Sequence, residues 1–236
     1  MTFVLVHGAY HGPWCWELLV PELAARGHDA VTVDLPVADP TADAAVYADV
    51  IDETVASVEN PILVAHSMSG IAAPIVAARR PLDLLVFLCG LIPLPGVSMS
   101  TRRKQEPVDP ETDISEAVFT SLGDGVWMVG EETAIAMFYN DLPLPLAEWA
   151  VSMLRPQAYR VFREPIPLET WPQVRCASIV CADDHAVNPM WGRRVAREQL
   201  GVAPIELEGG HSPFLGRPAE LAEVLVSLTG SPSLTG

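Results

Sequence analysis

One serine stands where the sequence pattern changes abruptly, and its hydroxyl could act as a nucleophile. Ser67 follows the apolar run 61–64 and precedes the alanine-rich segment 71–80, which predicts a buried strand turning directly into a helix. Small residues, Ala65 and Ser69, lie two positions away on either side, because strand and helix backbones almost touch in such a turn. Serine also favours the N-cap of a helix, so this segment alone leaves both interpretations open.

Acids and a histidine follow two later apolar runs. Asp183 and Asp184 come after the first of these runs, and His211 comes after the second. A histidine can take the proton of a serine and return it to a leaving group, while an acid holds the imidazole in the required tautomer. The chain order serine, acid, histidine is that of hydrolases built on a parallel sheet.

Two backbone N–H groups are candidates for stabilising the negative oxygen that forms during acyl transfer. The first belongs to Met68, directly after the nucleophile. The second belongs to Ala9, in the glycine-rich loop 7–13 that follows the first apolar run. Losing one such donor typically raises the barrier by about 3 kcal/mol.

The elements that must position these groups alternate along the chain. Apolar runs typical of buried strands are each followed by a helical pattern, which predicts an α/β fold with a mostly parallel sheet and helices on both faces. In such a sheet the carboxyl ends of the strands meet at one edge, where ligands bind. We expect strands at 3–6, 29–35, 61–64, 84–89, 177–180 and 204–207, and helices at 14–26, 42–58, 71–80, 190–200 and 218–228.

The alternation stops at Gly90 and resumes near residue 174. Prolines punctuate the segment 91–173, and a structureless loop of that length is uncommon in a compact domain. We therefore expect an inserted helical cap at 91–173 over a core formed by 1–90 and 174–230, with a frayed tail at 231–236. Short helices are expected within the cap at 115–122, 131–139 and 146–154.

Composition narrows the classes of partner. The 236 residues are 50% hydrophobic and include 30 acids against 14 Lys and Arg, a net charge of −16, which disfavours nucleic acids and anionic membranes. The chain begins directly with a strand pattern, and no apolar run approaches the roughly 18 residues of a membrane span. We expect a cytoplasmic protein that acts on a small molecule. The oligomeric state is left open, a homodimer included.

Neither the cysteines nor the histidines predict a metal site. No cysteine pair has the spacing of a metal knuckle, so we expect buried free thiols. His7 and His11 lie in a glycine-rich loop rather than on a helix, and hydrogen bonds that shape the loop are the expected role. His66 is expected to pack beside the nucleophile. No metal and no other cofactor is predicted.

The motifs together resemble the α/β-hydrolase superfamily over nearly the whole chain. The loop 7–16 (HGAYHGPWCW) resembles the opening loop of the small esterase and hydroxynitrile lyase group, which includes plant methyl-salicylate esterases. The resemblance implies the α/β-hydrolase fold and a serine–histidine–acid triad, and the acid of this group matches Asp184 rather than Asp183. Three further segments, 94–98, 138–141 and 209–214, resemble bacterial members of the group.

The resemblance also favours one chemistry within the group. Its lyases carry a threonine and a lysine, which hold the cyanohydrin hydroxyl and the cyanide, where this chain has Gly8 and Ser212. Epoxide and haloalkane hydrolases of the fold use an aspartate nucleophile, so Ser67 argues against them.

We therefore expect a serine hydrolase that cleaves a small, rather apolar carboxylic ester, thioester or lactone through an acyl-enzyme on Ser67. The alternative is a non-hydrolytic member of the fold: a hydroxynitrile lyase, a cofactor-free biosynthetic cyclase or lyase, or a small-molecule receptor that keeps the triad. Side chains that could line the pocket, each equally compatible with the core, are Tyr10, Trp127, Met128, Phe138, Tyr139, Trp149 and Met153.

Overall fold

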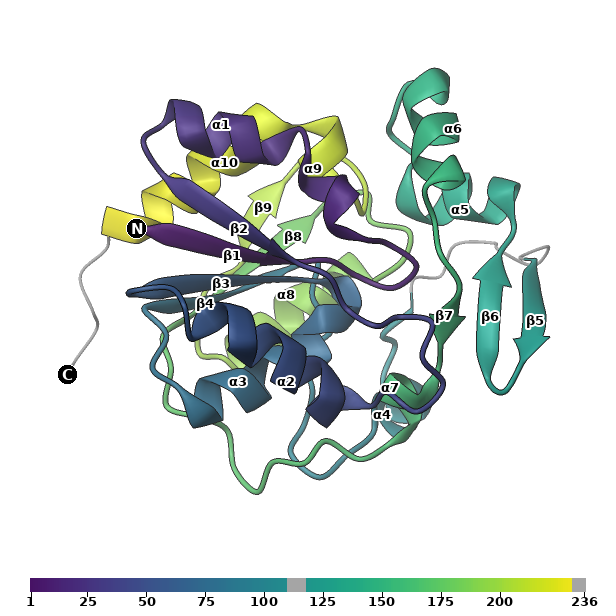
Figure 1. Cartoon of the computed structure of the whole chain (residues 1–236), viewed down its shortest axis with the longest axis horizontal. Coiled ribbons are helices and arrows are strands. Elements are labelled where there is room, and N and C mark those ends of the chain that lie inside the picture. Colours follow the sequence, from purple (N-terminus) through teal and green to yellow (C-terminus); the bar gives the residue numbers. More distant parts are fainter. Residues whose placement is uncertain (110–117, 231–236) are drawn as a thin grey trace.

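A six-stranded, wholly parallel sheet forms the centre of the computed structural model, which describes residues 1–109 and 118–230 (Figure 1). Its strand order is β2-β1-β3-β4-β8-β9, and the strands correspond to the six apolar runs of the sequence. The predicted α/β fold with a parallel sheet is confirmed. The strands are β1 (Thr2–Val6), β2 (Asp29–Val33), β3 (Pro61–His66), β4 (Leu84–Leu88), β8 (Cys176–Cys181) and β9 (Ile205–Leu207).

Helices cover both faces of this sheet and create two separate hydrophobic cores (Figure 1). On one face lie α1 (Leu19–Ala25), α9 (Pro213–Gly216) and α10 (Pro218–Ser227). On the other face lie α2 (Ala44–Val55), α3 (Ala73–Arg79) and α8 (Pro189–Glu198). Short 3₁₀ turns complete the core at η1 (Pro13–Trp16), η2 (Ser67–Ile71) and η3 (Leu228–Gly230).

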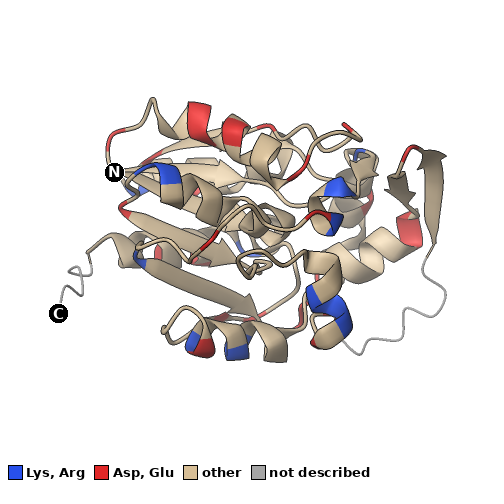
Figure 2. Cartoon of the chain, turned by 90° about the horizontal axis from the view of Figure 1, so that it is seen from below, with Lys and Arg blue, Asp and Glu red and all other residues tan. Residues whose placement is uncertain are grey.

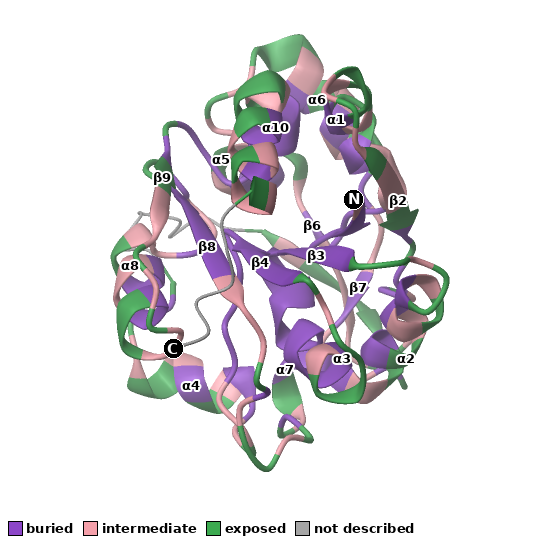
Figure 3. Cartoon of the chain, turned by 90° about the vertical axis from the view of Figure 1, so that its left-hand side faces the viewer, coloured by how far each residue is buried: buried purple, intermediate pink, exposed green. Residues whose placement is uncertain are grey.

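Alternation of side chains along the strands assigns each residue to one of the two cores. In β1, Phe3 and Leu5 pack on the side of α1, whereas Val4 and Val6 pack on the side of α2. All six residues of β3 are buried, as the purple strands of Figure 3 show. Each fully buried large apolar side chain contributes roughly 2 kcal/mol relative to an exposed one. A one-residue slip would exchange the two faces, so burial fixes the register of the sheet.

The segment between β4 and β8 is only partly helical. The expected helices at 131–139 and 146–154 are confirmed as α5 (Glu131–Phe138) and α6 (Leu144–Ser152). Two helices that the sequence did not predict also form in the described part of this segment, α4 (Met99–Gln105) and α7 (Arg160–Arg163). A small antiparallel sheet, ordered β5-β6-β7, stands beside these helices and comprises β5 (Phe119–Gly123), β6 (Val126–Val129) and β7 (Gln157–Ala158).

The expected helix at 115–122 is wrong where it can be compared, because residues 119–122 belong to β5. The reason is a tight hairpin after this strand: Gly123, Asp124 and Gly125 all have positive φ values, of 92°, 49° and 77°. Such a turn sends the chain back as β6 and cannot continue a helix. Residues 110–117 and the expected tail 231–236 lie outside the described residues. The division into core and cap at residues 90 and 174 remains a prediction.

Charged residues lie mostly on the helices and loops that surround the sheet (Figure 2).

The expected helix 14–26 is divided, because the chain forms η1 first and starts α1 only at Leu19. Within the described ranges, no helix has the length and apolarity needed to cross a bilayer.

Candidate active site

Ser67 occupies a sharp turn between β3 and η2. Its φ is +52°, a left-handed conformation that is uncommon for a residue with a side chain. Such strain costs on the order of 1–3 kcal/mol and persists only where surrounding contacts enforce it. One of these contacts is the hydrogen bond from the Leu91 N–H to the Ser67 carbonyl, at 2.9 Å. The geometry is that of a nucleophile elbow, in which the hydroxyl is presented at the tip of the turn.

The small residues around the elbow each have a defined role. The Ser69 hydroxyl lies 3.0 Å from the Val6 carbonyl and 2.9 Å from the His66 carbonyl, so it can donate to either. A serine thus replaces the usual glycine and links the elbow to β1. Gly70 permits close packing, because a Cβ there would lie only 2.6 Å from the Leu91 carbonyl.

Gly8 passes directly over the elbow. A Cβ at this position would lie 2.8 Å from Nδ1 of His66 and 2.9 Å from Cβ of Ser67, closer than real Cβ contacts allow. A threonine in the manner of the hydroxynitrile lyases therefore does not fit this backbone. Gly8, which the resemblance takes as favouring ester hydrolysis, is required here because its backbone passes so close to Ser67 and His66.

His211 and Asp184 form a buried pair at the ends of β9 and β8. Nδ1 of His211 lies 2.9 and 2.8 Å from the two carboxylate oxygens of Asp184, and both residues are buried. Asp184 also accepts hydrogen bonds from the N–H groups of Ala186 and Val187, at 2.8 and 2.9 Å. Because the carboxylate is an acceptor, Nδ1 of His211 carries a proton and Nε2 is the nitrogen left for chemistry. Asp183 is exposed and makes no side-chain contact of this kind within the described chain.

The loops that carry these two residues are joined to each other and to the link between α5 and α6. The Asp183 N–H donates to the Gly209 carbonyl at 3.0 Å, which joins the acid loop to the histidine loop. Asn140, directly after α5, donates from Nδ2 to the Asp183 carbonyl at 3.0 Å. Its side chain also packs against Gly210, where a Cβ would collide with it. The segments 138–141 and 209–214, noted in the sequence as separate motifs, therefore meet at this point.

His66 supports the histidine loop from beneath. Its Nε2 donates to the carbonyl of His211 at 2.9 Å, and the two rings lie 4.6 Å apart between centroids. Burial lowers the pKa of His66 well below its usual value, so the ring is neutral. The expected packing role thus includes a hydrogen bond that sequence reasoning missed. Nothing in the local pattern around His66 signals a partner 145 residues away.

Electrostatics at His211 favour the imidazolium that forms when it accepts a proton. Burial by itself lowers the pKa of His211, but the charge and hydrogen bond of Asp184 outweigh burial and raise it above 6.5. The sulfur of Cys89, at the end of β4, lies within 4.8 Å of ligand atoms of both residues. The contact with Cys181, together with burial, raises the pKa of the Cys89 thiol, which keeps it protonated. These three groups could hold a metal by position alone, but the Asp184 carboxylate already engages Nδ1 of His211.

The hydroxyl of Ser67 is unpaired within the described part of the chain. No hydrogen bond joins it to His211 or to another described residue, although the sequence predicts that the two lie within reach. Catalytic hydrogen bonds are often long before substrate binds and shorten in the complex. The N–H groups of Ala9 and Met68 likewise donate to no atom of the described residues, and both residues line the cavity in front of Ser67.

The cavity that contains Ser67 has a volume of about 270 Å³. Of the seven predicted pocket residues, Tyr10 and Phe138 line it. The other five are not among the residues that line it: Tyr139 is buried and donates to His11, Trp149 packs against Trp14, Trp127 packs against Tyr159, Met128 is partly buried against the hydrophobic core on the α1 side of the sheet, and Met153 is exposed. Residues that the sequence did not single out complete the lining: Leu91, Arg103, Asp109, Phe119, Met137, Tyr159, Phe162, His185, Ala186 and Val187.

The remaining loop histidines shape the floor of the site. His7 accepts from the Leu35 N–H at 3.0 Å, and Nδ1 of His11 lies 2.7 Å from the Ala9 carbonyl. Arg155 of the cap donates to the His11 carbonyl at 2.8 Å and to Asp34 at 2.7 Å. These hydrogen bonds fix the loop that carries Ala9, in the way expected for loop-shaping histidines.

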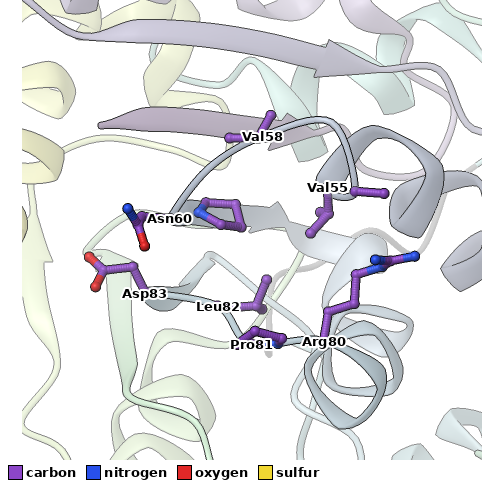
Figure 4. Close-up of a pocket in the computed structure, with 9 residues that line it drawn as sticks. Val55, Val58, Asn60, Arg80, Pro81, Leu82 and Asp83 are labelled. Atoms are coloured by element: carbon purple, nitrogen blue, oxygen red, sulfur yellow. The ribbon is translucent and has the colours of Figure 1, made fainter.

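A second hollow, of about 330 Å³, lies at the opposite edge of the sheet (Figure 4). It is lined by Asn60 and Asp83, which precede β3 and β4, and by Arg80, which pairs with Asp52. The described side chains that line this hollow include no serine, cysteine or threonine nucleophile and no histidine base. The carboxyl edge of the sheet is therefore the better candidate.

Comparison with known proteins agrees with this geometry. The family model described as "Alpha/beta hydrolase family" matches residues 3–224. The chain belongs to this family. It is 24% identical over 256 residues to methyl jasmonate esterase 1 of Vitis vinifera, a match that covers 98% of this chain and 97% of the relative. It is 27% identical over 258 residues to norfluorocurarine synthase 2 of Strychnos sp, with coverage of 96% and 94%.

Among solved structures, a polyneuridine aldehyde esterase mutant superposes with a TM-score of 0.83 at 23% identity, covering 96% of this chain and 98% of that one. At this identity the likeness concerns the fold. The predicted α/β-hydrolase fold and the methylesterase-like group are thereby confirmed, and the relatives are mostly esterases and hydrolases by name. The closer likeness to bacterial members remains a prediction.

Proposed function

We propose that this α/β hydrolase is a serine esterase that cleaves a small, rather apolar carboxylic ester, thioester or lactone. The observation that carries the proposal is the strained elbow at Ser67, which opens into a cavity at the same sheet edge as the buried His211–Asp184 pair. The methylesterase names of several relatives support the same reaction.

In this mechanism Ser67 Oγ attacks the carbonyl carbon while Nε2 of His211 takes its proton. The negative oxygen of the tetrahedral intermediate accepts hydrogen bonds from the N–H groups of Ala9 and Met68. His211 then gives the proton to the departing alcohol, and the acyl group remains on Ser67. A water, deprotonated by His211, hydrolyses this acyl-enzyme and restores the serine.

Substitution of the nucleophile provides the test. Ser67→Ala should lower kcat for a p-nitrophenyl ester by about 10⁴-fold or more, because no other group can form the acyl-enzyme. A fluorophosphonate should label the wild-type protein at Ser67, as read by mass spectrometry of peptides. Ser69→Ala is the matched control: its hydroxyl bonds to backbone carbonyls and not to substrate, so labelling should persist. Undiminished turnover by Ser67→Ala would refute the proposal.

A second candidate is a non-hydrolytic reaction on the same machinery, since one relative is named a synthase. A hydroxynitrile lyase is the least favoured version, because Gly8 leaves no room for a threonine. A cofactor-free lyase or cyclase, or a receptor that keeps the triad, would give no labelling at Ser67 and no product from any ester in a broad screen. Those two results together would favour this candidate over the esterase.

A further inference from the structure

Of the described residues that line the cavity in front of Ser67, Arg103 is the one lysine or arginine. Arg103, on α4, lines the cavity together with aromatic and aliphatic side chains of the cap and the core. Its guanidinium lies over the ring of Phe162, 5.4 Å from the centroid. The basic turn to which it belongs is the blue end of the helix that leads into the grey trace in Figure 2. A cation at this place is not needed to bind a plain alkyl ester.

The Arg103 side chain is only partly satisfied. Its Nε lies 3.3 Å from a carboxylate oxygen of Asp109, yet this atom is buried and the contact lacks the alignment of a hydrogen bond. Asp109 is 60% exposed in its side chain, so water competes for it. An ion pair of this kind is weak, and its carboxylate can be exchanged for that of a ligand at small cost.

Two tyrosines add hydrogen-bonding groups to the same wall. The hydroxyls of Tyr10 and Tyr159 lie 3.0 Å apart, and both residues line the cavity. Burial raises the pKa of the Tyr10 phenol and the positive charge of Arg103 acts in the opposite sense, so this phenol stays protonated. Only one of the two hydroxyls can donate to the other, so the proton of the remaining hydroxyl is available to an acceptor on the ligand.

We propose that Arg103, with the Tyr10 and Tyr159 hydroxyls, binds a carboxylate on the substrate, so that the preferred esters are monoesters of short dicarboxylic acids. The inference rests on the proposed esterase function and narrows its substrate class. The ester end would lie at Ser67 and the carboxylate at Arg103. A cavity of about 270 Å³ holds roughly nine atoms the size of a water molecule, which suits an acyl chain of a few carbons.

The test compares two esters that differ in one charge: monomethyl adipate and dimethyl adipate. Arg103→Leu should lower kcat/KM for the monoester about 10-fold or more and change it less than threefold for the diester, because a charged hydrogen-bond partner is lost for one substrate only. Lys104→Leu removes the same charge from the next, exposed position and should leave the ratio between the two esters unchanged. Arg103→Lys keeps the charge and should restore part of the preference.

Turnover of the diester serves as the internal control for folding. Equal losses for both esters in Arg103→Leu, or an equal change in Lys104→Leu, would overturn the proposal. Asp109→Asn leaves Arg103 in place and removes its competitor, so kcat/KM for the monoester should rise about threefold. An unchanged or lower kcat/KM would mean that the role of Arg103 is to pair with Asp109 and not with the substrate, and would also overturn the proposal.

Binding without turnover separates this proposal from the proposed function. Calorimetric titration of adipate into Ser67→Ala, and into the same variant carrying Arg103→Leu, measures the carboxylate site directly. Adipate should bind the first at least 10-fold more tightly than the second. Equal affinities would refute the role of Arg103 while leaving the esterase intact, whereas a difference without any ester turnover would refute the esterase alone.

Discussion

At the level of single residues, the site depends on contacts that hold unfavourable conformations in place. Ser67 has a positive φ, and so does Cys89 at the end of the neighbouring strand, with φ of 46°. Both residues end adjacent parallel strands of the sheet, where the chain must leave the plane within one residue. The strained serine exposes its hydroxyl to the cavity, while the strained cysteine places its thiol beside His211 and Asp184.

The Asp184 carboxylate should set the pH dependence of the reaction. Catalysis needs neutral His211, and Asp184 raises the pKa of this histidine, so kcat/KM for p-nitrophenyl acetate should increase with pH and reach half its maximum above pH 6.5. In Asp184→Asn the charge is gone and burial dominates, so the same half-maximum should shift to lower pH. The value of kcat should fall by about 10³- to 10⁴-fold, since the tautomer is no longer held. A pH profile with an unmoved half-maximum would contradict this assignment.

Sequence alone identifies the candidate nucleophile and base better than it identifies the contacts that support them. Ser67 and His211 follow apolar runs and fall in a known chain order, so their type and position carry the signal. The hydrogen bond from His66 to the His211 carbonyl joins residues far apart in the chain, and it depends on how two loops fold over the sheet. No spacing rule encodes such a contact.

At the level of elements, the short link between α5 and α6 contacts the loop of Asp184 and the loop of His211 at once. Asn140 in this link reaches the acid loop through the Asp183 carbonyl and packs against Gly210 of the histidine loop. The link therefore supports the loops of Asp184 and His211, while Met137 and Phe138 of α5 line the cavity.

Loss of this support should affect turnover more than binding. Asn140→Ala should lower kcat for a p-nitrophenyl ester about 10-fold, with KM changed less than threefold, because the histidine and acid loops lose a shared anchor while the cavity wall remains. Asn140→Asp keeps the shape and removes the donor to the Asp183 carbonyl, so it should show a similar loss. Steady-state kinetics distinguish the outcomes: an effect on KM alone would mean that Asn140 serves substrate binding instead.

Elements of the core were predictable for a reason that does not extend to the cap. The strands of the core are buried on both faces and read as continuous apolar runs, as β3 and β4 do. In contrast, β5 (Phe119–Gly123) is mostly exposed: only Phe119 is partly buried and the other four residues face solvent, so its composition carries no strand signal. The cavity lining depends on which faces of α4 and α5 turn inward, and this follows from packing between distant segments rather than from local periodicity.

At the level of the whole molecule, neutral histidines are buried where the cap meets the core. His11 contacts Tyr139 of the cap at 2.9 Å, and burial lowers the pKa of His11 to about 3. Burial lowers the pKa of His66 in the same way, whereas the pKa of His211 is raised. His11 and His66 make folding less favourable as pH falls below 6.5, because these two side chains bind protons in the unfolded chain and stay neutral in the folded one. His211 acts in the opposite sense, since its folded form keeps a proton above pH 6.5.

The contribution of one of these histidines can be isolated by removing it. Between pH 7.5 and 5.5, a histidine that stays neutral when folded lowers the free energy of unfolding by about 1.4 kcal/mol, from an unfolded pKa near 6.5. His11→Asn should therefore lose about 1.4 kcal/mol less than the wild type over this interval, whatever its stability at pH 7.5. Urea denaturation of both proteins at the two pH values measures the difference. If the two proteins lost equal stability, His11 would have to be protonated in the folded state, and the ring could not accept the Tyr139 hydroxyl that joins the cap to the core.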